Sequence, residues 1–330
     1  MDYRYLGETG LRVSRLAFGT MSFGKEADER ESAALYATCR EAGINLFDCA
    51  DVYAKGRSEE ILGSLMRGHR DEILLATKGS FPMAPHPNAC GASRSHLIRA
   101  CEASLKRLQT DRIDIYYVHR FDPQTRLEET LRGLEQLVRD GKILYPAVSN
   151  FAAYQTQAAL DFQRQANLTP LACIQPMYNL LKRQAESEIL PMARDNRLAV
   201  FPYSPLAAGL LTGKYLGKGA SPDSRMLTSK TYQVRYGQLD AQGVAEAVVN
   251  KARELGVTPA ALAIAWVMRH PTVTAPLLGA RSVEQLRPCL AASNLTLSDA
   301  EYAALSALTP EPAPATDRHD DGTEHDLWRR

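Results

Sequence analysis

The sequence predicts a single (β/α)8 TIM barrel preceded by a β-hairpin, and three observations support this fold class. Apolar runs typical of strands buried on both faces alternate eight times with amphipathic helical segments. No GxGxxG motif follows the first of these strands, although an open dinucleotide-binding sheet often has one there. Several strands end on polar residues, and a barrel builds its site from such strand ends.

The chain opens with RYLGETGLRVSRLAFG, where two short alternating runs flank Gly-Glu-Thr-Gly and predict the hairpin. The strand segments that follow are LAFGT, NLFDCA, ILLATKG, DIYYVHR, LYPAVSN, LACIQPMYN, AVFPYSP and APLLGA. A helical segment follows each of them. Gly43 is expected to end the first helix, Ser58 to cap the second, and Ser298 to cap a short helix after the repeats. We expect one barrel domain over residues 1–310 and a disordered, Pro-rich then acidic tail over 311–330.

Composition narrows the classes of protein that the chain can belong to. The 330 residues include 39 basic and 38 acidic ones without a basic block, so we expect no nucleic-acid partner. The apolar stretches are too short to span a bilayer, and the N-terminus lacks a secretory signal, so we expect a cytoplasmic protein without membrane association. Six scattered cysteines without CxxC pairs predict reduced thiols. The sequence shows no cluster of Cys and His residues that could bind zinc, so we expect no metal site.

Four polar residues on three successive strand segments form the candidate catalytic site. They are Asp48, Tyr53, Lys78 and His119. An ammonium beside a phenol lowers the phenol's pKa, so Lys78 is expected to ease proton release from Tyr53, with Asp48 holding Lys78 in place. His119 is expected to orient a carbonyl oxygen. A buried Asp–Lys pair is often structural and Tyr is a common core residue, so the combination, not any single member, carries the functional interpretation.

These residues lie in stretches that resemble the aldo-keto reductases. The matching stretches are LGETGLRVSRLAFGTMSFG, AVSNF, IQPMYN, FPYSPLAAGLLTGKY and LLGARSVEQL, and the resemblance runs from about Tyr3 to Ser306. The family's Asp, Tyr, Lys and His tetrad corresponds to the four candidates. The resemblance implies a (β/α)8 barrel that binds NADPH/NADP+ in extended form at the carboxyl ends of the strands.

The resemblance also assigns the nicotinamide end of the cofactor site. Ser149, Asn150 and Gln175 correspond to the groups that hydrogen-bond the carboxamide, which needs both donors and acceptors. From the residues alone, ordinary strand-end polarity explains these three equally well. Tyr203 corresponds to the aromatic residue on which the nicotinamide ring stacks.

Further along the cofactor, SPLAAGLLTGK resembles a pyrophosphate loop whose small residues let backbone N–H groups approach phosphate. Gly279, Arg281, Ser282 and Gln285 correspond to the adenosine 2′-phosphate site at a helix N-terminus, which favours NADPH over NADH. A surface position is the alternative reading of Arg281. The remaining cofactor-binding positions are Gly19, Thr20, Met21, Asp48, Ser204, Leu206, Ala208, Gly209 and Lys214.

Two positions depart from common family patterns. Pro288 and Cys289 stand where many members carry Glu-Asn for the adenine, and neither offers a carboxylate or an amide. Arg120 follows His119 where another branch has Trp. The second departure places the chain nearer the bacterial and potassium-channel-β-like branches.

The leading functional hypothesis is NADPH-dependent, reversible reduction of an aldehyde or ketone, with Tyr53 as proton donor. The alternative is an NADPH-binding regulatory module resembling potassium-channel β-subunits, and a lyase or isomerase is disfavoured because it leaves the nicotinamide-like residues without a role. Phe23, Phe81 and Phe121 are candidate substrate walls and suggest an apolar or ring-bearing carbonyl compound. The loops 81–91 and 217–237 are expected to shape the mouth, and an oligomer is compatible with the sequence.

Overall fold

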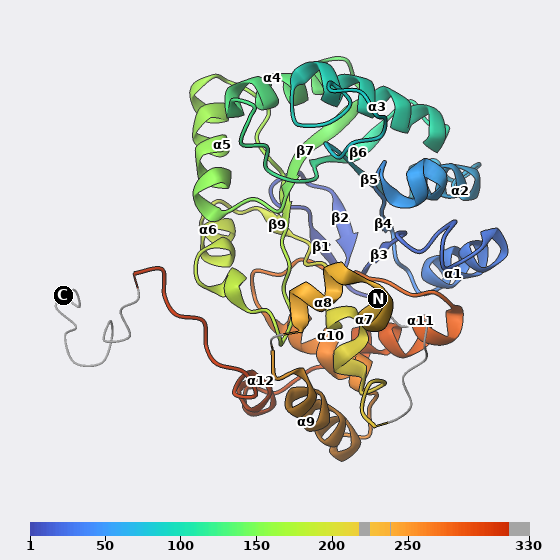
Figure 1. Cartoon of the computed structure of the whole chain (residues 1–330), viewed down its shortest axis with the longest axis vertical. Coiled ribbons are helices and arrows are strands. Elements are labelled where there is room, and N and C mark those ends of the chain that lie inside the picture. The colour runs from blue at the N-terminus through green and yellow to red at the C-terminus, as the bar shows by residue number, and fades with distance from the viewer. Residues whose placement is uncertain (218–224, 238, 317–330) are drawn as a thin grey trace.

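The computed structural model describes residues 1–217, 225–237 and 239–316, and these residues form the expected (β/α)8 barrel (Figure 1). Its parallel strands lie in the order β10-β3-β4-β5-β6-β7-β8-β9. They are β3 (Ala17–Gly19), β4 (Leu46–Asp48), β5 (Leu74–Gly79), β6 (Ile113–Val118), β7 (Ile143–Ser149), β8 (Cys173–Gln175), β9 (Ala199–Val200) and β10 (Leu277–Leu278). Six strands lie within the predicted segments, and β6 and β7 each begin one residue before theirs, so the predicted fold class is confirmed.

Backbone hydrogen bonds join the two edge strands and close the sheet. The N–H of Leu277, at the start of β10, donates to the carbonyl of Pro202 at 2.9 Å, and the N–H of Thr274 donates to Val200 of β9 at 2.9 Å. The carboxyl ends of the eight strands therefore surround one mouth, where the βα loops build the site.

The predicted hairpin is confirmed and closes the opposite end of the barrel. Strands β1 (Tyr3–Tyr5) and β2 (Arg12–Ser14) pair antiparallel. Leu6, which follows β1, and Val13, which lies in β2, are fully buried in one apolar cluster with the first inward-facing side chains of the barrel strands, such as Leu46. This end of the barrel interior is therefore filled with side chains.

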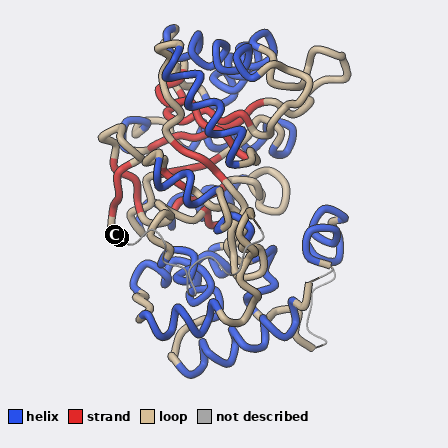
Figure 2. Tube along the Cα trace, turned by 90° about the vertical axis from the view of Figure 1, so that its left-hand side faces the viewer, coloured by secondary structure: helices blue, strands red, loops and turns tan. Residues whose placement is uncertain are grey.

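Helices lie around the strands (Figure 2) and bury their apolar faces in a second, larger cluster between helices and sheet. The α-helices are α1 (Glu29–Glu41), α2 (Arg57–Leu65), α3 (Arg94–Leu108), α4 (Leu127–Arg139), α5 (Ala153–Gln165), α6 (Ile189–Asp195), α7 (Arg225–Thr228), α8 (Lys230–Tyr236), α9 (Ala241–Glu254), α10 (Pro259–Arg269), α11 (Val283–Leu290) and α12 (Asp299–Ser306). The short 3-10 helices are η1 (Tyr53–Gly56), η2 (Arg70–Glu72), η3 (Gln184–Glu186), η4 (Ala207–Thr212) and η5 (Ala291–Asn294).

Two of the three predicted helix ends are confirmed. Gly43 adopts a left-handed φ of 82° just after α1, and Ser298 caps α12 in a capping box with Glu301. The prediction for Ser58 is wrong, because α2 begins one residue earlier and follows a left-handed Gly56. The Ser58 hydroxyl instead donates to the backbone carbonyl of Thr20 at 2.8 Å. The buried carbonyl of Thr20, just after β3, needs a hydrogen-bond donor, and the Ser58 hydroxyl provides it and is therefore not the cap of α2.

The structure describes the C-terminal tail and the mouth loop only in part. Residues 317–330 of the expected disordered tail, and 218–224 of the expected mouth segment, lie outside the described residues. The described part of the tail has neither helix nor strand, and the carbonyl of Ala313 accepts a hydrogen bond from Ser187 at 2.9 Å. Among the described helices, none combines the length and the apolar character that crossing a membrane requires.

Candidate active site

Lys78 is the centre of the site. Its side chain points from β5 into the barrel and is fully buried. The ammonium donates to Asp48 Oδ2 at 2.5 Å, to the Cys49 carbonyl at 2.7 Å and to the Tyr53 hydroxyl at 3.5 Å. Burial opposes the charged form, yet the Asp48 carboxylate and the Tyr53 hydroxyl raise the pKa of Lys78 above its usual value. The ammonium therefore stays protonated although it lies in the dry interior.

Asp48 ends β4 and receives two donors from other strands. Lys78 contacts one carboxylate oxygen, and the Gln175 side chain donates to the other at 2.9 Å. Burial raises the pKa of Asp48, and these two donors oppose that rise. A buried carboxylate with both oxygens bonded is held in one orientation, so Asp48 fixes the position of the ammonium.

Tyr53 opens the turn η1, which contains two left-handed residues other than glycine. Ala54 has a φ of 47° and Lys55 a φ of 54°, a conformation that costs energy and is found most often at functional sites. Burial raises the pKa of Tyr53 to about 12, while Lys78 lowers it. We expected the ammonium to bring this pKa below its usual value. The ammonium does act in that direction, but burial has the larger effect, so the phenol is protonated at neutral pH.

His119 follows β6 and faces the same mouth. Its backbone N–H donates to the carbonyl of Gly79 at 2.9 Å. Its ring packs edge-to-face on Phe81, with the centroids 4.6 Å apart, and on Tyr53, with the centroids 6.1 Å apart. Burial, assisted by the charge of Lys78, lowers the pKa of His119 to about 2. The imidazole is therefore neutral and carries one N–H. Its Nδ1 has no hydrogen-bond partner within the described parts of the chain.

The residues expected at the nicotinamide form one hydrogen-bonded network beside this tetrad. The Asn150 amide donates to the His119 carbonyl at 2.9 Å and to the Ser149 hydroxyl at 3.0 Å, and its oxygen accepts from the Tyr203 hydroxyl at 2.8 Å. Ser149 in turn donates to the carbonyl of Gln175 at 2.9 Å. The ends of β7 and β8 and the segment after β9 thus present amide and hydroxyl groups together at the mouth.

The expected pyrophosphate loop contains a run of left-handed residues. Ser204, Ala207, Ala208 and Gly209 have φ values of 58°, 49°, 59° and 89°. The N–H of Gly209 donates back to Leu206 at 2.8 Å. A Cβ on Gly209 would lie 2.5 Å from Cε of Lys214, so the lysine side chain packs directly over this turn. Strained backbone beside a cation is compatible with a phosphate group.

The loop after β3 supports the end of β4. Gly19 pairs with Asp48 in the sheet, and the N–H of Thr20 donates to the Asp48 carbonyl at 2.8 Å. Thr20 is fully buried, whereas Met21 is partly exposed. Within this loop, Thr20 thus positions Asp48 through the backbone.

The predicted 2′-phosphate site lies at the N-terminus of α11. Ser282 caps the helix and accepts from the Gln285 N–H at 3.3 Å, the Arg281 N–H donates to the Gln285 side chain at 3.3 Å, and Gly279 is exposed. A contact with α1 at this helix end could not be predicted from the sequence. The N–H of Val283 donates to the carboxylate of Glu31, which comes from α1, at 2.8 Å. A negative charge therefore already occupies part of this helix end.

Pro288 and Cys289, at the position expected to face the adenine, lie in the last turn of α11. Cys289 is buried, and its thiol donates to the carbonyl of Gln285 at 3.3 Å. Its side chain therefore faces the protein interior.

The three phenylalanines proposed as substrate walls differ in position. Phe81 packs on His119, and Phe121, which is partly buried, packs edge-to-face on Phe151 at 5.2 Å. Phe23 is fully buried and lies 5.8 Å from Phe18 in the core between sheet and helices. Its apolar neighbours draw it inward, so the interpretation of Phe23 as a substrate-facing wall needs correction.

Three further groups at the site escaped the sequence analysis. The Cys49 carbonyl accepts from Lys78, the Tyr117 ring lies 5.9 Å from the same ammonium, and the Arg235 guanidinium lies 5.7 Å from the Tyr203 ring. The alternation of side chains along β6 could have identified Tyr117, because it places Tyr117 on the lumen side. Nothing in the sequence pattern indicates the carbonyl or the position of Arg235.

Comparisons with known proteins agree with this geometry. The model of the Aldo/keto reductase family matches residues 15–310. A "Probable voltage-gated potassium channel subunit beta" of Arabidopsis thaliana is 38% identical over 299 residues, covering 87% of this chain and 89% of the relative. The "Uncharacterized oxidoreductase YrpG" of Bacillus subtilis is 38% identical over 96% of this chain and 98% of its own. The "L-glyceraldehyde 3-phosphate reductase" of Escherichia coli K12 is 35% identical over 100% of this chain and 95% of its own.

Proposed function

The chain belongs to the aldo/keto reductase family and is an oxidoreductase, and from this premise we propose that it reduces an aldehyde or ketone to an alcohol with NADPH. The observation that carries the proposal is the contact of one buried ammonium with both Asp48 and Tyr53. The neutral His119 ring faces Tyr53 across the same mouth. A carbonyl oxygen between the phenol and the imidazole would meet two hydrogen-bond donors.

The protonation states of the site suit the reduction direction. NADPH, when bound, supplies the hydride that reaches the carbonyl carbon. Tyr53 gives its proton to the carbonyl oxygen, and the resulting phenolate recovers a proton from water after the alcohol leaves. Lys78 stabilises the transient negative charge on Tyr53, and Asp48 keeps Lys78 in place. His119 orients the oxygen through its N–H, and the same groups can run alcohol oxidation in reverse.

The residues present fit the proposed cofactor. Ser149, Asn150 and Gln175 offer both donors and acceptors to a carboxamide, and the Tyr203 ring is held beside them by its bond to Asn150. The left-handed turn with Lys214 would hold the pyrophosphate. Arg281 and Ser282 would hold the 2′-phosphate at the N-terminus of α11.

The test uses purified protein, NADPH and a panel of aryl aldehydes, sugar carbonyls, pyridoxal and polycyclic ketones. Consumption of NADPH is followed by the absorbance of the reduced nicotinamide. We expect Tyr53→Phe to lower kcat by at least about 100-fold while NADPH still binds. Tyr154→Phe is the matched control, because Tyr154 lies on α5 and is 72% exposed. Unchanged turnover in Tyr53→Phe would exclude Tyr53 as the proton donor.

The second candidate is a regulatory NADPH-binding module, which the 38% identity to proteins described as potassium channel β-subunits favours. The same assay separates the two candidates. Tight NADPH binding without turnover of any carbonyl in the panel supports the regulatory module. Turnover that depends on Tyr53 supports the reductase.

A further inference from the structure

A second carboxylate lies three residues after Asp48, on the other side of the sheet. The N–H of Cys49 donates to Ala76 at 2.7 Å and that of Asp51 donates to Lys78 at 3.1 Å, so the pairing of β4 with β5 continues past the end of β4. Side chains alternate along such a ladder. Asp48 faces the lumen, so Cys49 and Asp51 face the helices.

The Asp51 side chain is 0% exposed. Among the described residues no side chain donates a hydrogen bond to its carboxylate, and only the backbone N–H of the next residue, Val52, lies close enough to lower its pKa. Leaving a buried acceptor unbonded costs about 1–3 kcal/mol, and more when it is charged. The proposed catalytic steps give Asp51 no role that would offset this cost.

Charged and titratable groups on four neighbouring elements interact electrostatically with Asp51, and Lys78 does so from the lumen side of the sheet. They are Lys78 on β5, Glu59 on α2, Arg107 on α3 and Tyr116 on β6. Glu59 is itself fully buried, but it accepts from the Thr77 hydroxyl at 2.6 Å and from Arg107 at 2.7 Å. The guanidinium of Arg107 therefore pairs with Glu59 and not with Asp51.

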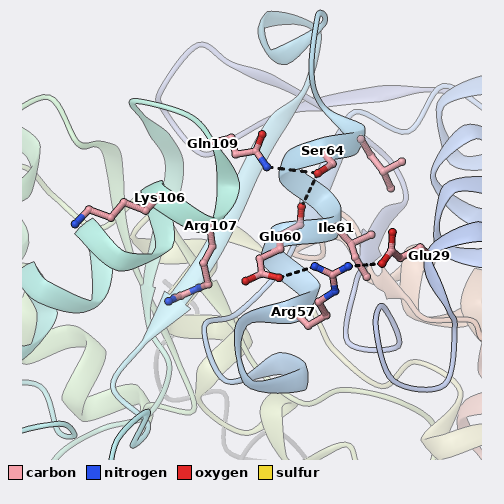
Figure 3. Close-up of a pocket in the computed structure, with 9 residues that line it drawn as sticks. Glu29, Arg57, Glu60, Ile61, Ser64, Lys106, Arg107 and Gln109 are labelled. Carbon is pink, nitrogen blue, oxygen red and sulfur yellow. Dashed lines mark hydrogen bonds and ion pairs between the residues drawn. The ribbon is translucent and has the colours of Figure 1, made fainter.

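Arg107 also connects the buried groups around Asp51 to the protein surface. Its side chain is 21% exposed and lines a pocket between α1, α2 and α3, together with Arg57, Glu60 and Gln109 (Figure 3). Arg57, which lines the same pocket, pairs with Glu29 and Glu60 (Figure 3). Among the described residues neither arginine forms an ion pair with Asp51, and the charges of both Arg107 and Lys78 act on its carboxylate through space.

We propose that Asp51 is a positioning residue whose gain or loss of a proton changes the charge around Lys78 and thereby the readiness of Tyr53 to donate its proton. The inference rests on the proposed reductase function. Burial, and then the charge of Glu59, raises the pKa of Asp51 to about 7, so its ionisation falls in the range where the enzyme would work. The backbone N–H of Asp51 also donates a hydrogen bond to the carbonyl of Lys78 at 3.1 Å, so the two residues are joined directly through the sheet.

The sign of the effect follows from the charges. Below its pKa, Asp51 is neutral and Lys78 is balanced by Asp48 alone. Above its pKa, Asp51 adds a negative charge behind Lys78, which disfavours the phenolate form of Tyr53. Carbonyl reduction should therefore slow as Asp51 ionises.

The test is the pH profile of kcat for carbonyl reduction in wild type, Asp51→Asn and the surface control Asp161→Asn. We expect kcat of the wild type and of the control to fall about threefold to tenfold across an inflection near pH 7. Asp51→Asn should lack this inflection and keep its low-pH kcat at high pH. NADPH affinity, measured by fluorescence at each pH, should be the same in all three proteins.

A second measurement does not depend on how the variant folds. In wild-type protein with carbon-13-labelled aspartate, one buried carboxyl group should titrate near pH 7. A wild-type profile without the inflection, an inflection that persists in Asp51→Asn, or no carboxyl titrating near pH 7 would each overturn the inference. Absence of turnover in every protein at every pH would contradict the proposed function itself, and the inference would fall with it.

Discussion

The proton-donating end of the site and the proposed 2′-phosphate end are built in opposite ways. At the first, Lys78 is fully buried, and both oxygens of Asp48 are bonded to groups from other strands. At the second, Gly279 and Gln285 are exposed, and a carboxylate from α1 reaches the helix end.

The buried end would therefore carry the proposed proton transfer, and the exposed end at α11 would decide between NADPH and NADH. A buried ion pair is strong but costly to disturb, so the barrel sheet holds Asp48 and Lys78 in one arrangement. Exposed charges are screened by water and salt, so the outer end can change by single substitutions at little cost in stability. Catalytic changes should therefore affect folding and rate together, whereas changes at the outer end should affect binding alone.

The largest expected effect is that of Lys78→Met. The variant should lose at least about 1000-fold in kcat and about 3–5 kcal/mol in the free energy of unfolding, because Asp48 is left buried without its cation. Urea unfolding and steady-state kinetics measure the two quantities. Lys106→Met, on the solvent side of α3, is the control. A variant with the stability of wild type would show that the two ends do not differ in the way described.

At the outer end, Arg281→Ala should weaken NADPH binding about 10- to 100-fold, because it removes charge-assisted hydrogen bonds to the 2′-phosphate. NADH affinity and the urea midpoint should stay as in wild type. Arg287→Ala, on the exposed side of the same helix, is the matched control. Equal losses for NADPH and NADH would place Arg281 away from the 2′-phosphate.

His119 gives a pH test of burial at the inner end. Its folded pKa of about 2 lies below its unfolded value of about 6.5, so the unfolded state takes up a proton first as the pH falls. Above pH 6.5, His119 therefore has no pH-dependent effect on the free energy of unfolding. For each pH unit below 6.5, it lowers that free energy by roughly 1 kcal/mol. Unfolding of wild type and His119→Asn at pH 7.5 and 5.5 should show a smaller acid loss in the variant. Equal losses would mean that His119 can be protonated in the folded state.

The smallest expected effect is that of Glu31→Gln. Removing one carboxylate from the N-terminus of α11 should tighten NADPH binding about twofold to fivefold and leave NADH binding unchanged. Glu29→Gln, in the same helix, is the control. The gain should shrink as salt is added. Weaker NADPH binding in Glu31→Gln would show that Glu31 orders the site.

Much of the fold followed from local patterns in the sequence. The eight strands and the hairpin were predictable because strands buried on both faces leave continuous apolar runs. The tetrad was predictable because polar groups at the ends of such strands have to meet around one mouth. The structure brings Asp48, Lys78 and Tyr53 into contact, as expected.

The errors concern contacts between distant segments. Ser58 failed as a helix cap because Thr20, 38 residues earlier, offers its carbonyl. The pKa of Tyr53 could not be predicted in direction, because it depends on the balance between burial and one nearby ammonium. Phe23 was placed in the mouth because it follows a strand, although its neighbours in the core decide its position. Glu31 reaches α11 from 252 residues away along the chain.

The hairpin that fills the amino-terminal end of the barrel has a kinetic consequence. Leu6 and Val13 pack into that end, so among the described residues the barrel interior is closed there and open at the mouth. Two molecules that stack in this interior must enter and depart through the same opening. If the proposed cofactor lies deeper than the carbonyl substrate, it would have to bind first and leave last, and the closed amino-terminal end would then set the order of binding and release.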